Sequence, residues 1–161
     1  MLYSSGSQLK ETSFSNENVI HARGESVVAI DPGSSKCGIA IVSCDLILVF
    51  RCIVSRDELN FELRRLVNLY SPSEIVVGNG TGGKTVLESI RSQVLSIPAS
   101  DIDEGHTTEL ARTRFLKEVP AKGLQRLLPA ALRTPPRPID DYAATILAER
   151  FWELKSQNDS N

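Results

Sequence analysis

The sequence predicts a single mixed α/β domain, and three observations lead to this fold class. The first third of the chain alternates short apolar runs with turn residues and has no helical pattern between those runs. After residue 56, segments with helical spacing alternate with short apolar segments. The chain has 161 residues, which is enough for one domain with a substantial core. These patterns predict an antiparallel meander followed by parallel strands with helical connections, rather than an all-parallel doubly wound sheet.

The individual elements follow from local signals. Leu59, Leu63 and Leu66 share one helical face, and Pro72 ends that helix. Thr107 is the expected N-cap of a later helix, and Pro138 suits the first turn of the last one. Repeated prolines predict a loop over 120–137. The expected elements are strands at 26–30, 37–43 and 46–54, a helix at 56–70, a strand at 74–77, a helix at 84–91, a strand within 94–102, a helix from 107 to about 119, and a helix from 138 onward.

Composition indicates where the domain ends and where the protein resides. We expect residues 1–24 to form a disordered tail, residues 25–155 to form the domain, and residues 156–161 to fray. No apolar run is long enough to span a bilayer, and the first residues lack the pattern of a secretory signal, so no membrane partner is expected. The three cysteines form no C-x-x-C pair, which favours reduced thiols and a cytoplasmic location.

Basic residues are concentrated in one part of an otherwise acidic chain. The net charge is -2, which argues against a generally basic nucleic-acid binder. Between Ala111 and Arg137, however, Glu118 is the only acidic residue among seven basic ones. Such a local patch can bind phosphates, although a solvated surface is the alternative. The basic residues are Arg112, Arg114, Lys117, Lys122, Arg126, Arg133 and Arg137.

Three acidic segments lie at the ends of predicted strands or the start of a helix. They are Asp31 after the first strand, Asp101 to Glu104 after the fifth strand, and Asp140 with Asp141 at the start of the last helix. If they meet at one sheet edge, their mutual repulsion calls for a divalent cation. Two such ions can support phosphodiester hydrolysis. The alternatives are local: a turn aspartate at 31 and helix-dipole carboxylates at 140 and 141.

A glycine-rich segment suggests a different function, nucleotide binding. Gly78 to Thr85 matches G-x-x-x-x-G-K-[ST], and it follows a predicted strand and precedes a predicted helix. In a P-loop nucleotide hydrolase, Lys84 would bind the terminal phosphate and Thr85 would bind magnesium. Three antiparallel strands precede this segment, whereas a P-loop normally follows the first strand of its domain. We therefore favour a glycine-rich rim, with Lys84 near a substrate phosphate.

Taken together, the segments resemble the RuvC/YqgF family of the ribonuclease H-like superfamily. The matching segments, in chain order from 27 to 152, are Ala29 to Ser34 with Gly38 to Ala40, Val76 to Gly78, Asp103-Glu104 with Thr107-Thr108 and Ala111-Arg112, the basic and proline-rich segments between Lys122 and Pro138, and Asp140 with Ala143-Ala144. The resemblance implies a ribonuclease H-like mixed five-stranded sheet flanked by helices. It also implies metal-dependent endonuclease activity on structured nucleic acid, namely Holliday junctions for RuvC and pre-16S rRNA ends for YqgF.

Carried over by position, the resemblance makes Asp31, Glu104 and Asp140 the catalytic acids and the ligands for Mg²⁺ or Mn²⁺. Asp141 is an adjacent candidate metal ligand that the resemblance does not settle. RuvC has its second acid after the fourth strand, where this chain has Gly78-Asn79, so the acid must come from Glu104 as in YqgF. Gly105 replaces an arginine that is usual in YqgF.

These matches and departures favour YqgF-like processing of pre-16S rRNA. The alternatives are a Holliday junction resolvase-like nuclease, a nucleic-acid-binding module without catalysis, and the P-loop hydrolase. We expect Lys84, Arg112, Arg126 and Arg133 to contact structured RNA or branched DNA, in a monomer or a homodimer.

Overall fold

A five-stranded mixed sheet forms the centre of the protein. The computed structural model describes residues 25–93, 97–129 and 132–159, so the tail predicted for residues 1–24 lies outside the described residues. The elements are β1 (Ser26–Pro32), β2 (Lys36–Ser43), β3 (Leu48–Ser55), α2 (Leu59–Tyr70), β4 (Glu74–Gly78), α3 (Gly83–Arg91), β5 (Ala99–Ile102), α4 (Thr107–Glu118), the 3-10 helix η1 (Gly123–Leu127) and α5 (Asp140–Asn158).

Strand β1 occupies the middle of the sheet, whose order is β3-β2-β1-β4-β5. β1 and β2 pair antiparallel, as do β2 and β3, because short turns join them. β4 pairs parallel with β1, and β5 pairs parallel with β4, through the connections that contain α2 and α3. This arrangement confirms the predicted meander followed by parallel strands. It also places the ends of β1, β4 and β5 at one edge.

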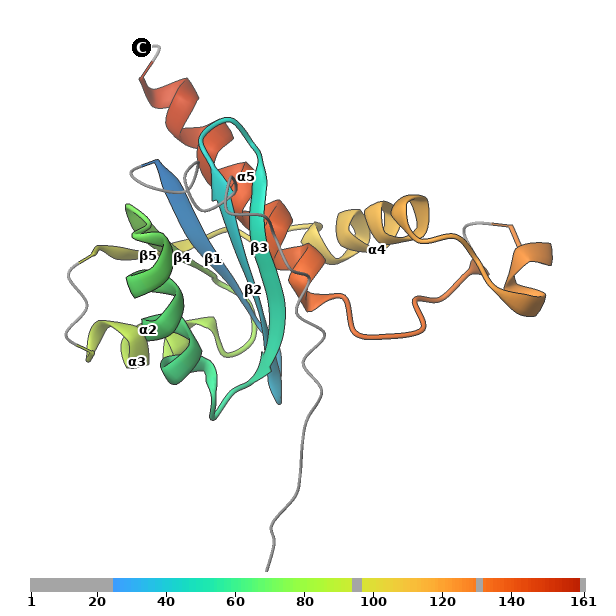
Figure 1. Ribbon diagram of the computed structural model, residues 1–161, viewed down its shortest axis with the longest axis horizontal. Coiled ribbons are helices and arrows are strands. Elements are labelled where there is room, and N and C mark those ends of the chain that lie inside the picture. Colours follow the sequence, from blue (N-terminus) through green and yellow to red (C-terminus); the bar gives the residue numbers. More distant parts are fainter. Residues whose placement is uncertain (1–24, 94–96, 130–131, 160–161) are drawn as a thin grey trace, which may run out of the picture.

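Helices cover both faces of the sheet (Figure 1). Alternate residues of β1 point to opposite faces, so Val28 and Ile30 pack in a core with α2 and α3, whereas Val27 and Ala29 pack in a core with α5. Both cores are closed to solvent, and each β1 residue from Ser26 to Ile30 is fully buried. β1 is thus fixed from both sides.

Several element ends differ from the sequence prediction. The segment after β3 forms a turn before α2 begins at Leu59, because Ser55 and Glu58 exchange hydrogen bonds there. His106, at φ 63°, is the N-cap residue of α4 instead of Thr107, whose buried hydroxyl donates to the Glu104 carbonyl. α5 begins at Asp140, so Pro138 precedes it rather than lying in its first turn.

The segment between α4 and α5 was predicted to be mostly loop. It is, but it also contains the short helix η1. At the other end of α5, residues 156–158 continue the helix, while residues 160–161 lie outside the described residues. None of the described helices combines the length and apolar character needed to cross a membrane.

Candidate carboxylate site

Asp31 lies on the α5 side of the sheet because it continues the alternation of Val27 and Ala29 along β1. Its partner on β2 is Gly38. A Cβ atom at Gly38 would overlap the backbone carbonyl of Asp140 and would lie 2.7 Å from the Asp141 nitrogen. Glycine is therefore required here because the start of α5 rests directly on β2. This contact brings the Asp140 backbone beside Asp31.

The turn after β1 approaches the Asp140 side chain as well. A Cβ atom at Gly33 would lie 3.5 Å from Asp140 Oδ1, and the Gly33 amide donates to the Lys36 carbonyl over 2.9 Å. The tight turn keeps β1 and β2 in register up to their ends. Asp31 and Asp140, which are 109 positions apart in the sequence, consequently meet at the same corner.

Glu104 is held from three directions. Its backbone amide donates to Asn79 Oδ1 over 3.4 Å, and its carbonyl accepts from the Thr107 hydroxyl over 2.8 Å. Its carboxylate fits against the end of β4: a Cβ atom at Gly78 would lie 2.7 Å from Glu104 Oε2, and one at Gly80 would overlap the carboxylate. Gly78 at the end of β4 and Gly80 after it thus make room for an acid that comes from the chain after β5.

Asp31 is electrostatically coupled to both of the other carboxylates. Burial, followed by the negative charges of Asp140 and Glu104, raises the pKa of Asp31 from 3.8 to about 7. Burial favours the neutral acid, and nearby like charges add to this effect. The structure therefore brings together the three acids Asp31, Glu104 and Asp140, whose repulsion a cation would relieve.

The donor chemistry of this group suits Mg²⁺ or Mn²⁺, because both ions prefer carboxylate oxygens. Mg²⁺ usually retains several waters and takes only one or two carboxylates from the protein. Within residues 25–93, 97–129 and 132–159, no three His, Cys, Asp or Glu side chains are close enough together to hold one ion directly. The three acids thus fit a hydrated ion in chemistry and charge, without forming a closed set of ligands.

The other predicted metal ligand, Asp141, points elsewhere. Its side chain is only 7% exposed and accepts two hydrogen bonds from Arg137, at 3.0 and 3.1 Å. Arg51 of β3 lies 3.6 Å away on another side and stacks on the Tyr142 ring at 3.8 Å. A buried carboxylate needs such partners. Asp141 therefore anchors α5 to β3 and the structure does not bring it into the carboxylate site.

The predicted nucleic-acid contacts are placed in two groups. Lys84 is exposed on α3, beyond the glycine-rich loop. Arg112 lies on α4, while Arg126 and Arg133 lie in the segment between α4 and α5, and only Arg126 of the three is exposed. Arg112 donates to the Arg133 carbonyl over 2.7 Å, and Arg133 donates to the Leu128 carbonyl over 2.9 Å. These two arginines therefore use donors to fix the backbone of the segment between α4 and α5.

Sequence reasoning missed two arginines near the site. Arg150 of α5 donates to the carbonyls of Asp103 and Gly105, on either side of Glu104. A guanidinium thus lies beside position 105 even though that residue is glycine. Arg56 lies over Gly82, where a Cβ atom would be 3.0 Å from its Nη1. Ten residues amount to about 2.8 turns and about 15 Å along α5, so helical spacing from Asp140 does not indicate Arg150. No sequence signal indicates Arg56.

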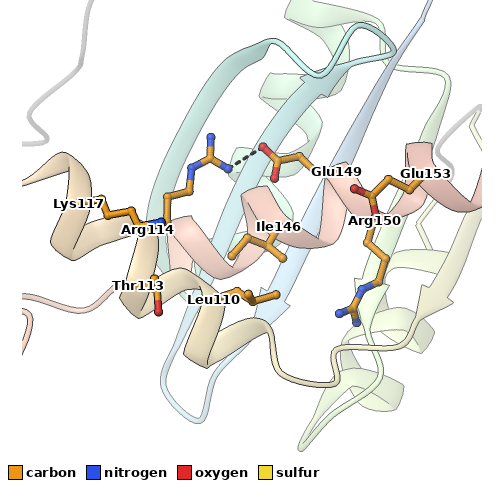
Figure 2. A pocket seen from close by; sticks show the side chains of 8 residues that line it. All are labelled: Leu110, Thr113, Arg114, Lys117, Ile146, Glu149, Arg150 and Glu153. Atoms are coloured by element: carbon orange, nitrogen blue, oxygen red, sulfur yellow. Dashed lines mark hydrogen bonds and ion pairs between the residues drawn. The ribbon is translucent and has the colours of Figure 1, made fainter. Parts of the chain in front are cut away.

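Arg150 also borders a groove between α4 and α5. The groove has a volume of about 350 Å³ and is separate from the carboxylates. Figure 2 shows Arg114 and Glu149 paired across it, at 2.6 Å, while Arg150 points away from that pair. Its lining residues are Leu110, Thr113, Arg114, Lys117, Ile146, Glu149, Arg150 and Glu153.

The glycine-rich loop does not form a free phosphate cradle. The Glu104 carboxylate fills the space beside Gly78 and Gly80, and its charge would repel a phosphate at that point. Lys84 and Thr85 are both exposed on α3. These positions favour the rim interpretation over the P-loop interpretation.

No protein-family model matches the sequence, and no curated protein matches it. Solved structures do match the fold. Thermus thermophilus RuvC is 13% identical with a TM-score of 0.51, and its complex with a Holliday junction substrate is 15% identical with a TM-score of 0.50. Each match covers 82% of this chain and 96% of the other. The chain therefore has a RuvC-like, ribonuclease H-like fold, as predicted.

Proposed function

We propose that this protein is a divalent-metal-dependent endonuclease that hydrolyses phosphodiester bonds in structured nucleic acid. The observation that carries the proposal is the half-buried Asp31 beside Asp140 and Glu104, with its pKa raised to about 7. Such perturbed carboxyls at a sheet edge are typical of functional sites. The ribonuclease H-like fold, shared with RuvC, supports the same activity class.

Asp31, Glu104 and Asp140 would hold Mg²⁺ or Mn²⁺ in this proposal. The ion would supply positive charge for the phosphate and activate the attacking water. The protein itself contributes the placement of the acids. Gly38 seats Asp140 against β2, while Asn79, Thr107 and Arg150 fix the backbone around Glu104.

For the substrate, we propose YqgF-like processing of pre-16S rRNA. Its support is that the second acid comes from Glu104 after β5, while Gly78 and Gly80 leave space for it at the end of β4. A four-way DNA junction is the second candidate, favoured by the resemblance in fold to a RuvC that binds a Holliday junction. A cytoplasmic location remains part of the proposal, on the evidence of cysteine usage.

The test is cleavage of labelled nucleic acids by the purified protein with Mg²⁺, Mn²⁺ or EDTA. The substrates are a precursor 16S rRNA fragment, single-stranded RNA and DNA, and a synthetic four-way junction. Asp31→Asn should abolish cleavage, whereas Asp101→Asn, which changes an exposed acid on β5, should retain it. Equal metal-dependent cleavage by both variants would overturn the proposal. Metal-independent binding without cleavage would instead identify a binding module that has lost catalysis.

A further inference from the structure

The segment between α4 and α5 exposes apolar side chains that no core covers. We call residues 120–129 and 132–138 the arm; in Figure 1 it projects beyond α4, away from the sheet, and returns to the start of α5. Leu124 is 83% exposed and Leu127 82% exposed, and Leu132 is 64% exposed. η1 contains no buried residue. Such strongly exposed leucines, concentrated in one short segment, indicate a surface that contacts something else.

The shape of the arm is fixed by arginines rather than by packing. Arg133 donates to the carbonyls of Leu128 and Arg126, over 2.9 and 3.5 Å, and the Arg133 carbonyl accepts from Arg112 of α4. These hydrogen bonds hold the returning part of the arm against η1. The leucines are thus presented on an ordered support, which reduces the entropy lost on binding.

Charge distinguishes between the possible ligands. No acidic residue occurs from Pro120 to Pro138, while Lys122 and Arg126 are exposed beside the leucines. A hollow of about 460 Å³ lies at the base of η1 and is lined by Pro120, Ala121, Arg126 and Arg133. A cationic concave surface next to apolar side chains fits a ligand that carries both phosphates and flat apolar rings.

The position of the arm points to the same ligand. The arm ends at Pro138, two residues before Asp140, and its other end follows the C-terminus of α4. The returning end of the arm is therefore joined to the carboxylate site, whereas its first end is separated from Glu104 by the 12 residues of α4. A nucleic acid bound at the carboxylates can extend along the returning part of the arm, so the proposed function already brings a ligand of this chemistry to this side of the molecule.

We propose that the arm binds nucleotides that have left the base stack, at a branch or at the end of a duplex. Leu124 and Leu127 contact the unstacked bases, and Arg126 contacts the phosphates. Apolar side chains act as wedges of this kind in other nucleic-acid complexes. The inference rests on the proposed function for the nature of the ligand, and it adds the structural feature of the substrate that is recognised.

The test measures binding of the full-length protein in EDTA, so that cleavage plays no part. The probes are a four-way DNA junction, an RNA stem with a single-stranded extension, and unbroken duplexes of both kinds, each with 2-aminopurine at the branch or its equivalent. The wild type should prefer the branched and extended probes and should increase their 2-aminopurine fluorescence. The Leu124→Gln/Leu127→Gln double variant should lose about tenfold in affinity for those probes and the fluorescence change, while binding to unbroken duplexes is retained.

Two further variants sharpen the result. Leu69→Gln alters a leucine that is 45% exposed on α2, in the opposite layer, and should bind like the wild type. Arg126→Gln should weaken binding to every probe and lower the salt dependence by about one phosphate contact. Sedimentation of the wild type and of the double leucine variant detects self-association through the arm.

The proposal is overturned if the double leucine variant keeps the wild-type ratio between the affinity for branched or extended probes and the affinity for unbroken duplexes. It is also overturned if the wild type binds none of the probes. A wild-type dimer that the leucine substitutions convert to a monomer also overturns it and assigns the arm to a second copy of the chain. None of these results depends on metal or on Asp31. Failure of the arm proposal is therefore distinguishable from failure of the nuclease proposal, which cleavage by Asp31→Asn would reveal.

Discussion

The carboxylate site and the arm follow opposite construction principles. At the site, backbone segments approach so closely that Gly38 and Gly33 have no room for a Cβ atom. In the arm, a Cβ atom at Gly123 would meet nothing within 4 Å, and the leucines of η1 face solvent. The site holds together groups that repel each other, which only tight packing can do. The arm exposes its leucines and Arg126 to a ligand, and it needs only enough conformational order to keep these side chains in position.

The two regions also differ in how they affect the free energy of folding. The ionised carboxylates at the site oppose folding in the absence of a cation, and the core around β1 offsets that repulsion. The arm contributes little to the core, so its exposed leucines leave folding almost unaffected. Substitutions in the two regions should therefore have very different consequences for stability.

The largest effect should come from Gly38→Ala. Its Cβ atom would overlap the Asp140 carbonyl, and because the overlap involves backbone on both sides, either α5 or β2 must move. We expect a loss of more than about 3 kcal/mol in the free energy of unfolding, at the upper end of the range for overpacking. Urea denaturation followed by circular dichroism measures it.

The matched substitution in the arm is Gly123→Ala. Its backbone has φ +58°, so alanine introduces local strain of about 1 kcal/mol but no clash. If Gly38→Ala were as mild as Gly123→Ala, the close contact between α5 and β2 would not be a determinant of the fold.

Asp31→Asn should increase stability at high pH. The folded pKa of about 7 exceeds the ordinary value of 3.8, so the folded protein binds the proton more tightly than the unfolded chain. The favourable contribution of protonated Asp31 is complete below about pH 4 and is lost as the pH rises through 7. Asparagine avoids this loss, which predicts about 2 kcal/mol of stabilisation at pH 8, discounted to roughly half of the full shift because the Asp31 carboxyl is partly exposed to solvent.

Thermal unfolding of the wild type and of Asp31→Asn at pH 4 and pH 8, in EDTA, tests the direction of this stability difference. The two proteins should differ at pH 8 and converge at pH 4. Adding Mg²⁺ at pH 8 should stabilise the wild type more than Asp31→Asn, since binding to the folded state alone raises stability. A destabilised Asp31→Asn protein at pH 8 would show that Asp31 makes favourable contacts that outweigh the repulsion.

The sequence was sufficient for the sheet and for the expectation that Asp31, Glu104 and Asp140 lie near one another, while their catalytic and metal-binding roles stay a prediction. The apolar runs and helical spacing set the element order, and the positions of Asp31, Glu104 and Asp140 at element ends indicated that they could meet. These signals are local periodicities, which a sequence displays directly.

Side-chain partnerships across elements were not predictable. Asp140 and Asp141 are adjacent acids in one helical turn, yet one joins the site and the other pairs with Arg137 and Arg51. The choice depends on how α5 is rotated on the sheet, which Gly38 and the buried ring of Tyr142 determine through contacts distant in sequence. The hydrogen bond from Arg133 to the Leu128 carbonyl was equally unpredictable. Basic composition alone does not show which arginines bind carbonyls of their own segment rather than a ligand.

A smaller change in stability with a large change in activity is expected for Gly80→Ala. Its Cβ atom would overlap the end of the Glu104 side chain, which can rotate away, so stability should fall by less than about 1 kcal/mol. The displaced carboxylate would no longer lie at the end of β4, so metal-dependent cleavage should fall by about a hundredfold. Cleavage rates and urea denaturation of the same sample measure both effects. Full activity would mean that Glu104 works from a position other than the one it occupies beside Gly80.

The smallest effect on stability is expected for Leu124→Gln. The side chain is 83% exposed and η1 has no buried residue, so replacing an apolar group by a polar one changes little that folding depends on. We expect the free energy of unfolding to stay within about 0.5 kcal/mol of the wild type in urea denaturation. A loss of 2 kcal/mol or more would mean that Leu124 packs within the protein. The arm would then belong to the core rather than to a binding surface, and the contrast with the carboxylate site would disappear.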